Sequence, residues 1–253
     1  MSKLWSKGYE LDDLVEEFTV GDDYLLDSRL VSADILGSLA HAEMLNRAGL
    51  LNDGHLAALK KGLIAILDEQ AAGNFVIRRS DEDGHTAIEN RLVELAGEAG
   101  KRIHLGRSRN DQILTVMRLW MREYLFQFIS TGSVLVSRLL DFAETHRLVP
   151  MPGRTHMQPA MPSSVGLWAG GFAEMLLDDL LCASSLYDYF DQCPLGSAAG
   201  YGTSLPLDRE LTAALLGFSR VQVNVAYGGL SRGKFESRLL EALDQTAITL
   251  SKF

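Results

Sequence analysis

The chain has 253 residues, of which 47% are hydrophobic and 23% charged, and these ordinary globular proportions exclude a disordered or low-complexity protein. Its 33 acidic and 24 basic side chains give a net charge of −9, opposite to that of most nucleic-acid binders, so we expect no nucleic-acid partner. Residues 1–13 lack the apolar core of a signal peptide, and no run reaches the roughly 18 apolar residues of a membrane span. We therefore expect a cytoplasmic protein with no membrane partner and with Cys182 and Cys193 as free thiols.

All six prolines lie between Pro150 and Pro206, so the chain before and after that region contains none. Proline removes a backbone donor from a helix interior, and long proline-free segments rich in Leu, Ala, Glu and Arg therefore favour helices. This distribution predicts an all-α fold class.

The first 112 residues predict a small helical domain. After a polar, acidic start, apolar residues recur at helical spacing in three segments: 30–46, 56–67 and 85–95. The third of these follows three acidic residues, of which Asp83 is placed to cap the helix. A basic segment, residues 101–111, ends this predicted domain.

Residues 113–253 predict a bundle of long helices. The pattern over 113–147 is the longest, and its apolar residues extend beyond one face, which is typical of a helix inside a bundle or between subunits. A second long pattern covers 164–189, and a third begins near Gly233 and still runs at Phe253 without a cap or turn. We therefore expect a bundle whose core is incomplete at the C-terminal end of this chain.

Four of the nine residues 101–109 are Lys or Arg, in an otherwise acidic chain. Arginine binds carboxylates through two parallel hydrogen bonds, and Ser108 and Asn110 add short polar side chains, so this segment is a candidate anion site. The alternative is a solvated loop whose arginines pair with the acidic residues around Asp83.

A second candidate is the stretch 151–160, which prolines hold out of a regular helix between two long helical segments. Histidine exchanges protons near neutral pH, so His156 is suited to proton transfer, and Thr155 is suited to orient a ligand. The alternative is a structural histidine with one hydrogen bond. No neighbouring residue completes a metal site. The glycine-rich stretch 194–204 lacks the spacing and lysine of a phosphate-binding loop, and it favours a flexible connection between helices.

Taken together, several of these stretches resemble the argininosuccinate lyase family and the related δ-crystallins. The resemblance rests on three motifs and a later connector, in the order of the family: DEDGHTAIE (81–89), HLGRSRNDQ (104–112), GRTHMQP (153–159) and PLGSAAGYGTSLPLDRE (194–210). The second and third motifs together distinguish this family from fumarase, aspartase and adenylosuccinate lyase in the same superfamily.

The resemblance implies a fumarase/aspartase-like fold, with a small N-terminal helical domain (1–112) followed by a long-helix bundle (113–253, partial). It implies reversible cleavage of argininosuccinate to arginine and fumarate in arginine biosynthesis, without cofactor or metal. It also implies a homotetramer in which each active site draws residues from three chains.

The resemblance assigns site residues by position in its motifs. His156 is the proton-transferring catalytic residue, acting directly or through a water. The substrate-binding residues are Thr155, Asn110, Arg109 and Ser108, with His85 and Gln158 as supporting members. Asp23 stands where many members have a substrate-binding serine, so it either turns away from the anionic substrate or binds its arginine part.

Two departures keep other functions open. Residues 224–234 differ from the pattern S-x-D-A-V-S-D-R-D that many members show, and Asp23 replaces the usual serine. In addition, the family's loop with the catalytic serine falls beyond Phe253. We therefore expect this chain to be inactive by itself. The alternatives are a non-catalytic, δ-crystallin-like structural protein or pseudo-subunit, and a superfamily lyase that acts on another fumarate adduct.

Overall fold

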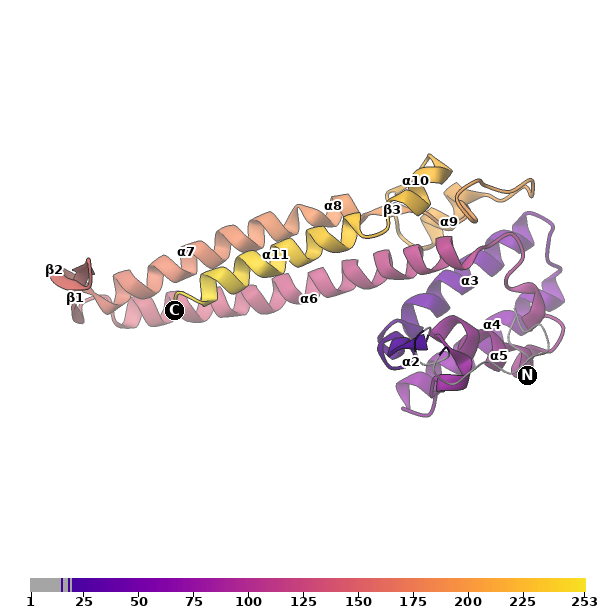
Figure 1. Ribbon diagram of the computed structural model, residues 1–253, viewed down its shortest axis with the longest axis horizontal. Helices are drawn as coiled ribbons and strands as arrows, with labels where there is room; N and C mark the ends of the chain where they lie inside the picture. Colours follow the sequence, from indigo (N-terminus) through magenta and orange to yellow (C-terminus); the bar gives the residue numbers. More distant parts are fainter. Residues whose placement is uncertain (1–14, 16–17, 19) are drawn as a thin grey trace. The chain divides into compact units, whose positions relative to one another are not determined.

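The computed structural model describes residues 15, 18 and 20–253, so the prediction about a signal peptide at residues 1–13 falls outside it. The chain groups into two compact units. Unit 1 contains the described residues up to Trp120 together with Gln192–Leu230, and unit 2 contains Met121–Asp191 and Ser231–Phe253. Helices dominate both units, which confirms the predicted all-α class (Figure 1). The division into domains 1–112 and 113–253 stays a prediction.

Unit 1 is built on helices that pack around a buried aliphatic core. Helix α3 packs against α4, and α4 against α5; Ile35, Leu63 and Leu92, one from each helix, are fully buried in this core. Asp83 caps α5 by accepting a hydrogen bond from the backbone N–H of Thr86 at 2.7 Å, as the sequence predicts. Its elements are α2 (Asp23–Leu26), η1 (Asp27–Arg29), α3 (Val31–Arg47), α4 (Asp53–Ala71), η2 (Arg79–Asp81), α5 (Gly84–Ala96), η3 (Gly100–Arg102), the start of α6 (Arg109–Thr145), β3 (Gln192–Cys193), α9 (Arg209–Leu215), β4 (Arg220–Val221) and α10 (Val225–Leu230).

The connection after residue 191 is more ordered than predicted. Strand β3 pairs in parallel with β4, and residues 191–197 are buried. Arg209 donates hydrogen bonds to the carbonyl oxygens of Leu195 at 3.1 Å and Gln222 at 2.8 Å. The prediction of a flexible connection is therefore wrong for the first half of 194–204, because its backbone groups are bound by side chains far away in sequence.

Unit 2 is a bundle of long helices. The elements are the rest of α6, β1 (Pro150–Thr155), β2 (Gln158–Ser164), α7 (Val165–Ser184), α8 (Leu186–Phe190) and α11 (Lys234–Leu250). Helix α7 packs against α11 (Figure 1). Leu176 and Leu180 of α7 share a core with Val136 of α6. A Cβ at Gly132 would lie 2.6 Å from the Leu180 side chain, so this glycine allows the two helices to approach.

Large apolar side chains remain exposed on three helices of unit 2. Phe126 on α6 is 67% exposed, and Leu167 on α7 and Leu240 on α11 are exposed as well. Some of the apolar residues beyond one face of 113–147 are therefore not buried by the described residues. In the part of the chain that the structure describes, no helix has both the length and the apolar character needed to cross a membrane.

The stretch predicted as a loop between long helices is a β-hairpin. Strands β1 and β2 pair antiparallel, with an irregularity between Pro152 and Arg154, and Thr155 faces Gln158 across the turn. Four prolines in two strands and the absence of Asn-Gly at the turn conceal this hairpin in the sequence.

Candidate active site

Unit 1 brings the DEDGHTAIE motif and the basic segment together. Arg109 forms an ion pair with Asp83 and donates a hydrogen bond to Oγ1 of Thr86 at 2.8 Å. Since Asp83 also caps α5, the first residue of α6 is joined to the first turn of α5. For Arg109, the pairing with the acidic cluster is therefore observed, and its charge is neutralised within the unit.

Ser108 and Asn110 stand at the N-terminus of α6, a helix of 37 residues. The backbone N–H of Ser108 donates to Asp111 at 2.9 Å, and that of Asn110 donates to Oγ of Ser108 at 3.3 Å. This reciprocal arrangement is a capping box with aspartate as its acid. It places Asn110, which is exposed, at the partly positive end of the helix dipole, where an anion is stabilised.

Asp111 fixes the connector segment to this helix end. Its buried carboxylate accepts hydrogen bonds from the backbone N–H groups of Gly196 at 2.9 Å and Ala198 at 2.8 Å, in addition to that of Ser108. Burial raises the pKa of Asp111, although these three hydrogen bonds oppose the rise. The residue therefore holds together the capped turn and residues 194–198.

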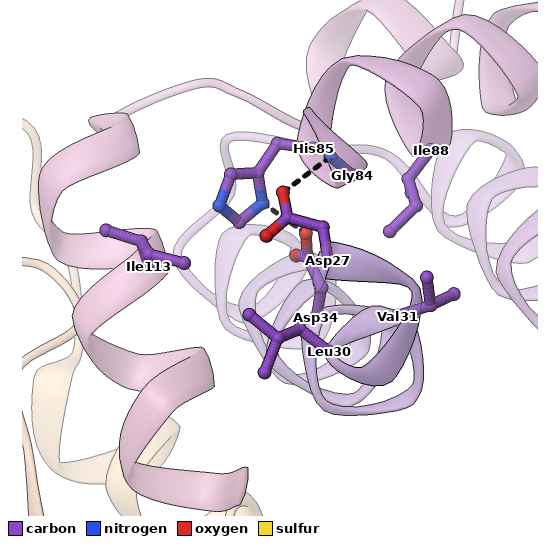
Figure 2. A pocket seen from close by; sticks show the side chains of 8 residues that line it. All are labelled: Asp27, Leu30, Val31, Asp34, Gly84, His85, Ile88 and Ile113. Atoms are coloured by element: carbon purple, nitrogen blue, oxygen red, sulfur yellow. Dashed lines mark hydrogen bonds and ion pairs between the residues drawn. The ribbon is translucent and has the colours of Figure 1, made fainter. Parts of the chain in front are cut away.

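His85 lies buried at the first turn of α5 (Figure 2). Its Nδ1 is hydrogen-bonded to Oδ2 of Asp34, and its other ring nitrogen, Nε2, points away from that carboxylate. Burial disfavours the charged ring, but the charge and hydrogen bond of Asp34 outweigh it, so the pKa of His85 is raised. Burial likewise disfavours the Asp34 carboxylate, but His85, Arg107 and Gln112 outweigh it and lower the pKa of Asp34 to about 2.

A small cavity of about 10 Å³ adjoins this pair. It is lined by Asp27, Leu30, Val31, Asp34, Gly84, His85, Ile88 and Ile113 (Figure 2). Asp27 accepts a hydrogen bond from the backbone N–H of Gly84 at 2.8 Å, next to His85. Among the described residues, Nε2 of His85 has no hydrogen-bond partner although it is buried.

Asp23 is in the first and only turn of α2, and it is exposed. It is close enough to Asp27 for its charge to raise the pKa of that buried carboxyl, after the larger effect of burial. The structure therefore places Asp23 in the same unit as His85 but does not assign it a contact with a ligand.

Thr155, His156 and Gln158 belong to unit 2, at the tip of the β1–β2 hairpin, and all three are exposed. The two turn residues have positive φ, +49° at His156 and +61° at Met157. Residues other than Gly, Asn, Asp and His rarely adopt this conformation, so Met157 is the strained position of the turn, and such positions are concentrated at functional sites. Within unit 2, no described side chain hydrogen-bonds to the His156 ring.

The sequence did not indicate the buried polar residues below the capped turn. In α3 the apolar spacing predicts the helix but not the role of Asp34. Asp34 and Ser38 lie one helical turn apart on the buried side, and this polar pair is the sequence signal for a buried polar site. Arg107 and Gln112 belong to a motif that was identified, but their burial was not predicted. No group of three or more His, Cys, Asp or Glu side chains able to hold a metal occurs within residues 15, 18 and 20–253.

A family model described as lyase matches residues 8–253. The argininosuccinate lyase of Thermotoga neapolitana is 46% identical over 251 residues, which are 99% of this chain and 63% of that protein. The argininosuccinate lyase of Stenotrophomonas maltophilia strain R551-3 is 44% identical over 250 residues, 98% of this chain and 58% of that protein. The chain thus spans about three-fifths of the length of these relatives.

Two solved structures have a similar fold. An EDDS lyase in complex with formate matches with a TM-score of 0.79 and 28% identity, over 97% of this chain and 48% of that one. A fumarate lyase:delta crystallin from Brucella melitensis bound to cobalt matches with a TM-score of 0.80 over 94% of this chain and 57% of that one. At 23% identity, this second likeness supports the fold alone.

Proposed function

We propose, from the premise that the chain belongs to the lyase family matched over residues 8–253, that the protein is an argininosuccinate lyase. It cleaves argininosuccinate reversibly to arginine and fumarate, in arginine biosynthesis. The relatives at 44–46% identity confirm the predicted resemblance to that family. The proposal assigns the activity for which these relatives are named to this protein as well. The single observation that carries the proposal is the exposed position of His156, directly after Thr155, on a turn whose two residues have positive φ.

The reaction is a β-elimination that needs a base, an acid and anion donors. A base removes the proton from the carbon next to a carboxylate, and preorganised donors stabilise the negative charge that develops there. The C–N bond then breaks, its electron pair leaves with the guanidino nitrogen, and an acid supplies the proton that this nitrogen takes up. His156 is this proton-transferring residue, directly or through a water.

The substrate's carboxylates bind at the N-terminus of α6. Asn110 and Ser108 offer polar side chains there, and the helix dipole favours an anion. Arg109 contributes positive charge, but its ion pair with Asp83 makes it chiefly a residue that fixes the turn. The supporting roles of His85, Gln158 and Thr155 follow the family motifs, and Asp23 is assigned to the arginine part of the substrate.

The protein forms a homotetramer with shared active sites, and it works in the cytoplasm. Two observations support the shared sites. The His156 ring lacks a hydrogen-bond partner within the described residues of unit 2, and the bundle helices of that unit keep large exposed apolar side chains, such as Phe126 and Leu240. Exposed apolar surface of this kind marks protein–protein contact sites.

The experiment is to measure fumarate release by the product of the complete gene, from argininosuccinate and separately from adenylosuccinate. We expect release from argininosuccinate alone, and its loss in His156→Asn.

Other outcomes favour the alternatives. Release from adenylosuccinate alone would show a lyase for another fumarate adduct. Release from neither substrate, by a protein that is folded and tetrameric, would favour a structural role.

A further inference from the structure

Helix α3 places one buried carboxylate between two of the sequence motifs of unit 1. Asp34 is 2% exposed, and its two oxygens have different partners. Oδ2 is hydrogen-bonded to Nδ1 of His85, whereas Oδ1 accepts a hydrogen bond from Nε2 of Gln112 at 2.8 Å. Asp34 therefore contacts the DEDGHTAIE motif with one oxygen and the HLGRSRNDQ motif with the other.

The second of these contacts reaches the capped turn. Gln112 lies in the first turn of α6, and its backbone N–H donates to the carbonyl oxygen of Ser108 at 3.1 Å. A weaker branch runs through Ser38, whose hydroxyl lies 3.4 Å from Oδ1 and accepts a hydrogen bond from Arg107 at 3.0 Å. Arg107 is buried immediately before Ser108, so both branches end at the turn that presents Ser108 and Asn110.

The first contact fixes the His85 ring. A buried carboxylate retains its charge only when donors replace the lost water, and the Nδ1–H of His85 is one of its two strong donors. With Nδ1 engaged, Nε2 is left as the ring atom that a ligand or a water must satisfy, because a buried polar atom without a partner costs free energy. The charged side chains that act on the ring are those of Asp34, Asp83, Arg107 and Asp27.

We propose that Asp34 is the positioning residue of this site, holding His85 so that Nε2 faces the bound ligand and holding the capped turn through Gln112. The group that Nε2 meets is a carboxylate oxygen of the substrate or a water that bridges to it. For the reaction, this inference rests on the proposed function; the orientation of His85 by Asp34 does not.

The first test needs no activity. Exchange of the imidazole C2 proton of each histidine with deuterium, followed over pH by mass spectrometry of the full-length protein, reports the pKa of His85. We expect this pKa to fall by about one unit or more in Asp34→Asn, because the neighbouring charge is removed. The matched control is Asp68→Asn, which changes an exposed carboxylate on α4.

An unchanged His85 pKa in Asp34→Asn would overturn the proposal. If that variant does not fold, the unsubstituted protein decides the question. A His85 pKa above the usual histidine value of 6.5 is expected, and a value at or below it would contradict the contact with a charged Asp34.

The second test is kinetic. For fumarate release from argininosuccinate, Asp34→Asn should lower kcat/KM by about tenfold or more and move the basic limb of its pH profile to lower pH, because His85 loses its proton earlier. Asp34→Glu, which keeps the charge, should restore the position of the basic limb. A loss of activity with an unmoved pH profile in Asp34→Asn would reduce Asp34 to a structural residue.

If no fumarate is released by the unsubstituted protein, the proposed function fails. The deuterium-exchange result then still decides whether Asp34 orients His85.

Discussion

The two histidines that the sequence identifies lie in contrasting surroundings. His85 is buried in unit 1 and bonded to Asp34, which is itself bonded to Gln112. His156 is exposed in unit 2, on a two-residue turn with positive φ. The His85 region has its supporting contacts within a single unit, whereas the hairpin presents an exposed histidine on a turn with positive φ.

The two histidines are therefore held in position by different means. Around His85, a buried polar network orients each side chain before any ligand binds. Among the described residues, it leaves Nε2 of His85, Nε of Arg107 and Oε1 of Gln112 without a hydrogen-bond partner. At the hairpin tip, the backbone turn sets the position of His156, and no described side chain of unit 2 hydrogen-bonds to its ring. Substitutions near His85 should therefore affect stability as well as activity, whereas loss of the His156 side chain should affect activity alone.

The largest effect is expected for His156→Asn in the full-length protein. Asparagine tolerates a positive φ, so the turn should be kept while the proton-transferring ring is lost. We expect turnover of argininosuccinate to fall by about 100-fold or more, which is typical for loss of a general acid or base, with an unchanged melting temperature. His55→Asn, on α4, is the matched control. Retained turnover in His156→Asn would refute the assignment of His156.

Asp111→Asn tests the opposite behaviour, in which stability changes. The carboxylate accepts three backbone hydrogen bonds, and an amide replaces one of its oxygens by a donor that faces N–H groups. We expect a loss of roughly 2–4 kcal/mol in the free energy of unfolding, measured with urea. Asp68→Asn should stay within about 0.5 kcal/mol of the unsubstituted protein. Equal effects of the two substitutions would show that Asp111 does not hold the connector.

The third prediction concerns pH. Burial, with smaller contributions from Arg107 and His104, lowers the pKa of His41 to about 3, while its Nε2 lies 2.8 Å from the Leu105 carbonyl oxygen. Because the unfolded chain takes up this proton near 6.5 and the folded chain does not, stability is lost as pH falls from about 6.5 towards 3. The slope is about 1.4 kcal/mol per pH unit.

His41→Gln keeps a donor for Leu105 but cannot titrate. Its unfolding free energy should therefore depend less on pH between 6 and 4 than that of the unsubstituted protein, by about 1.4 kcal/mol per unit. His55→Gln is the matched control, with the original slope expected. Identical slopes in all three proteins would mean that His41 is not held neutral in the folded chain.

The smallest effect is expected at the hairpin turn. Met157 is 90% exposed and has a φ of +61°, so Met157→Gly should relieve strain and stabilise unit 2 by about 0.5–1 kcal/mol. Met161→Gly, the same substitution in strand β2, should destabilise it, because glycine weakens a strand. A stabilisation by both or by neither would contradict the strain assigned to the turn.

The helices and the two candidate site segments can be predicted because they depend on local signals. Proline distribution, apolar spacing and the cap at Asp83 are encoded within a few residues, and the family motifs are continuous in sequence. The hairpin was not predictable from such signals, since His-Met is an unusual two-residue turn. The contacts of Asp34 with His85 and Gln112 join residues 51 and 78 positions apart, which no local pattern reveals.

The most direct test of the account is to co-express two full-length variants, His156→Asn and Asn110→Ala, each inactive alone. If the capped turn and the hairpin of one active site come from different chains, mixed tetramers contain some sites with both residues intact. We predict argininosuccinate cleavage in the mixture at about tenfold or more above either variant alone. A mixture that forms mixed tetramers and stays as inactive as its parents would contradict the account.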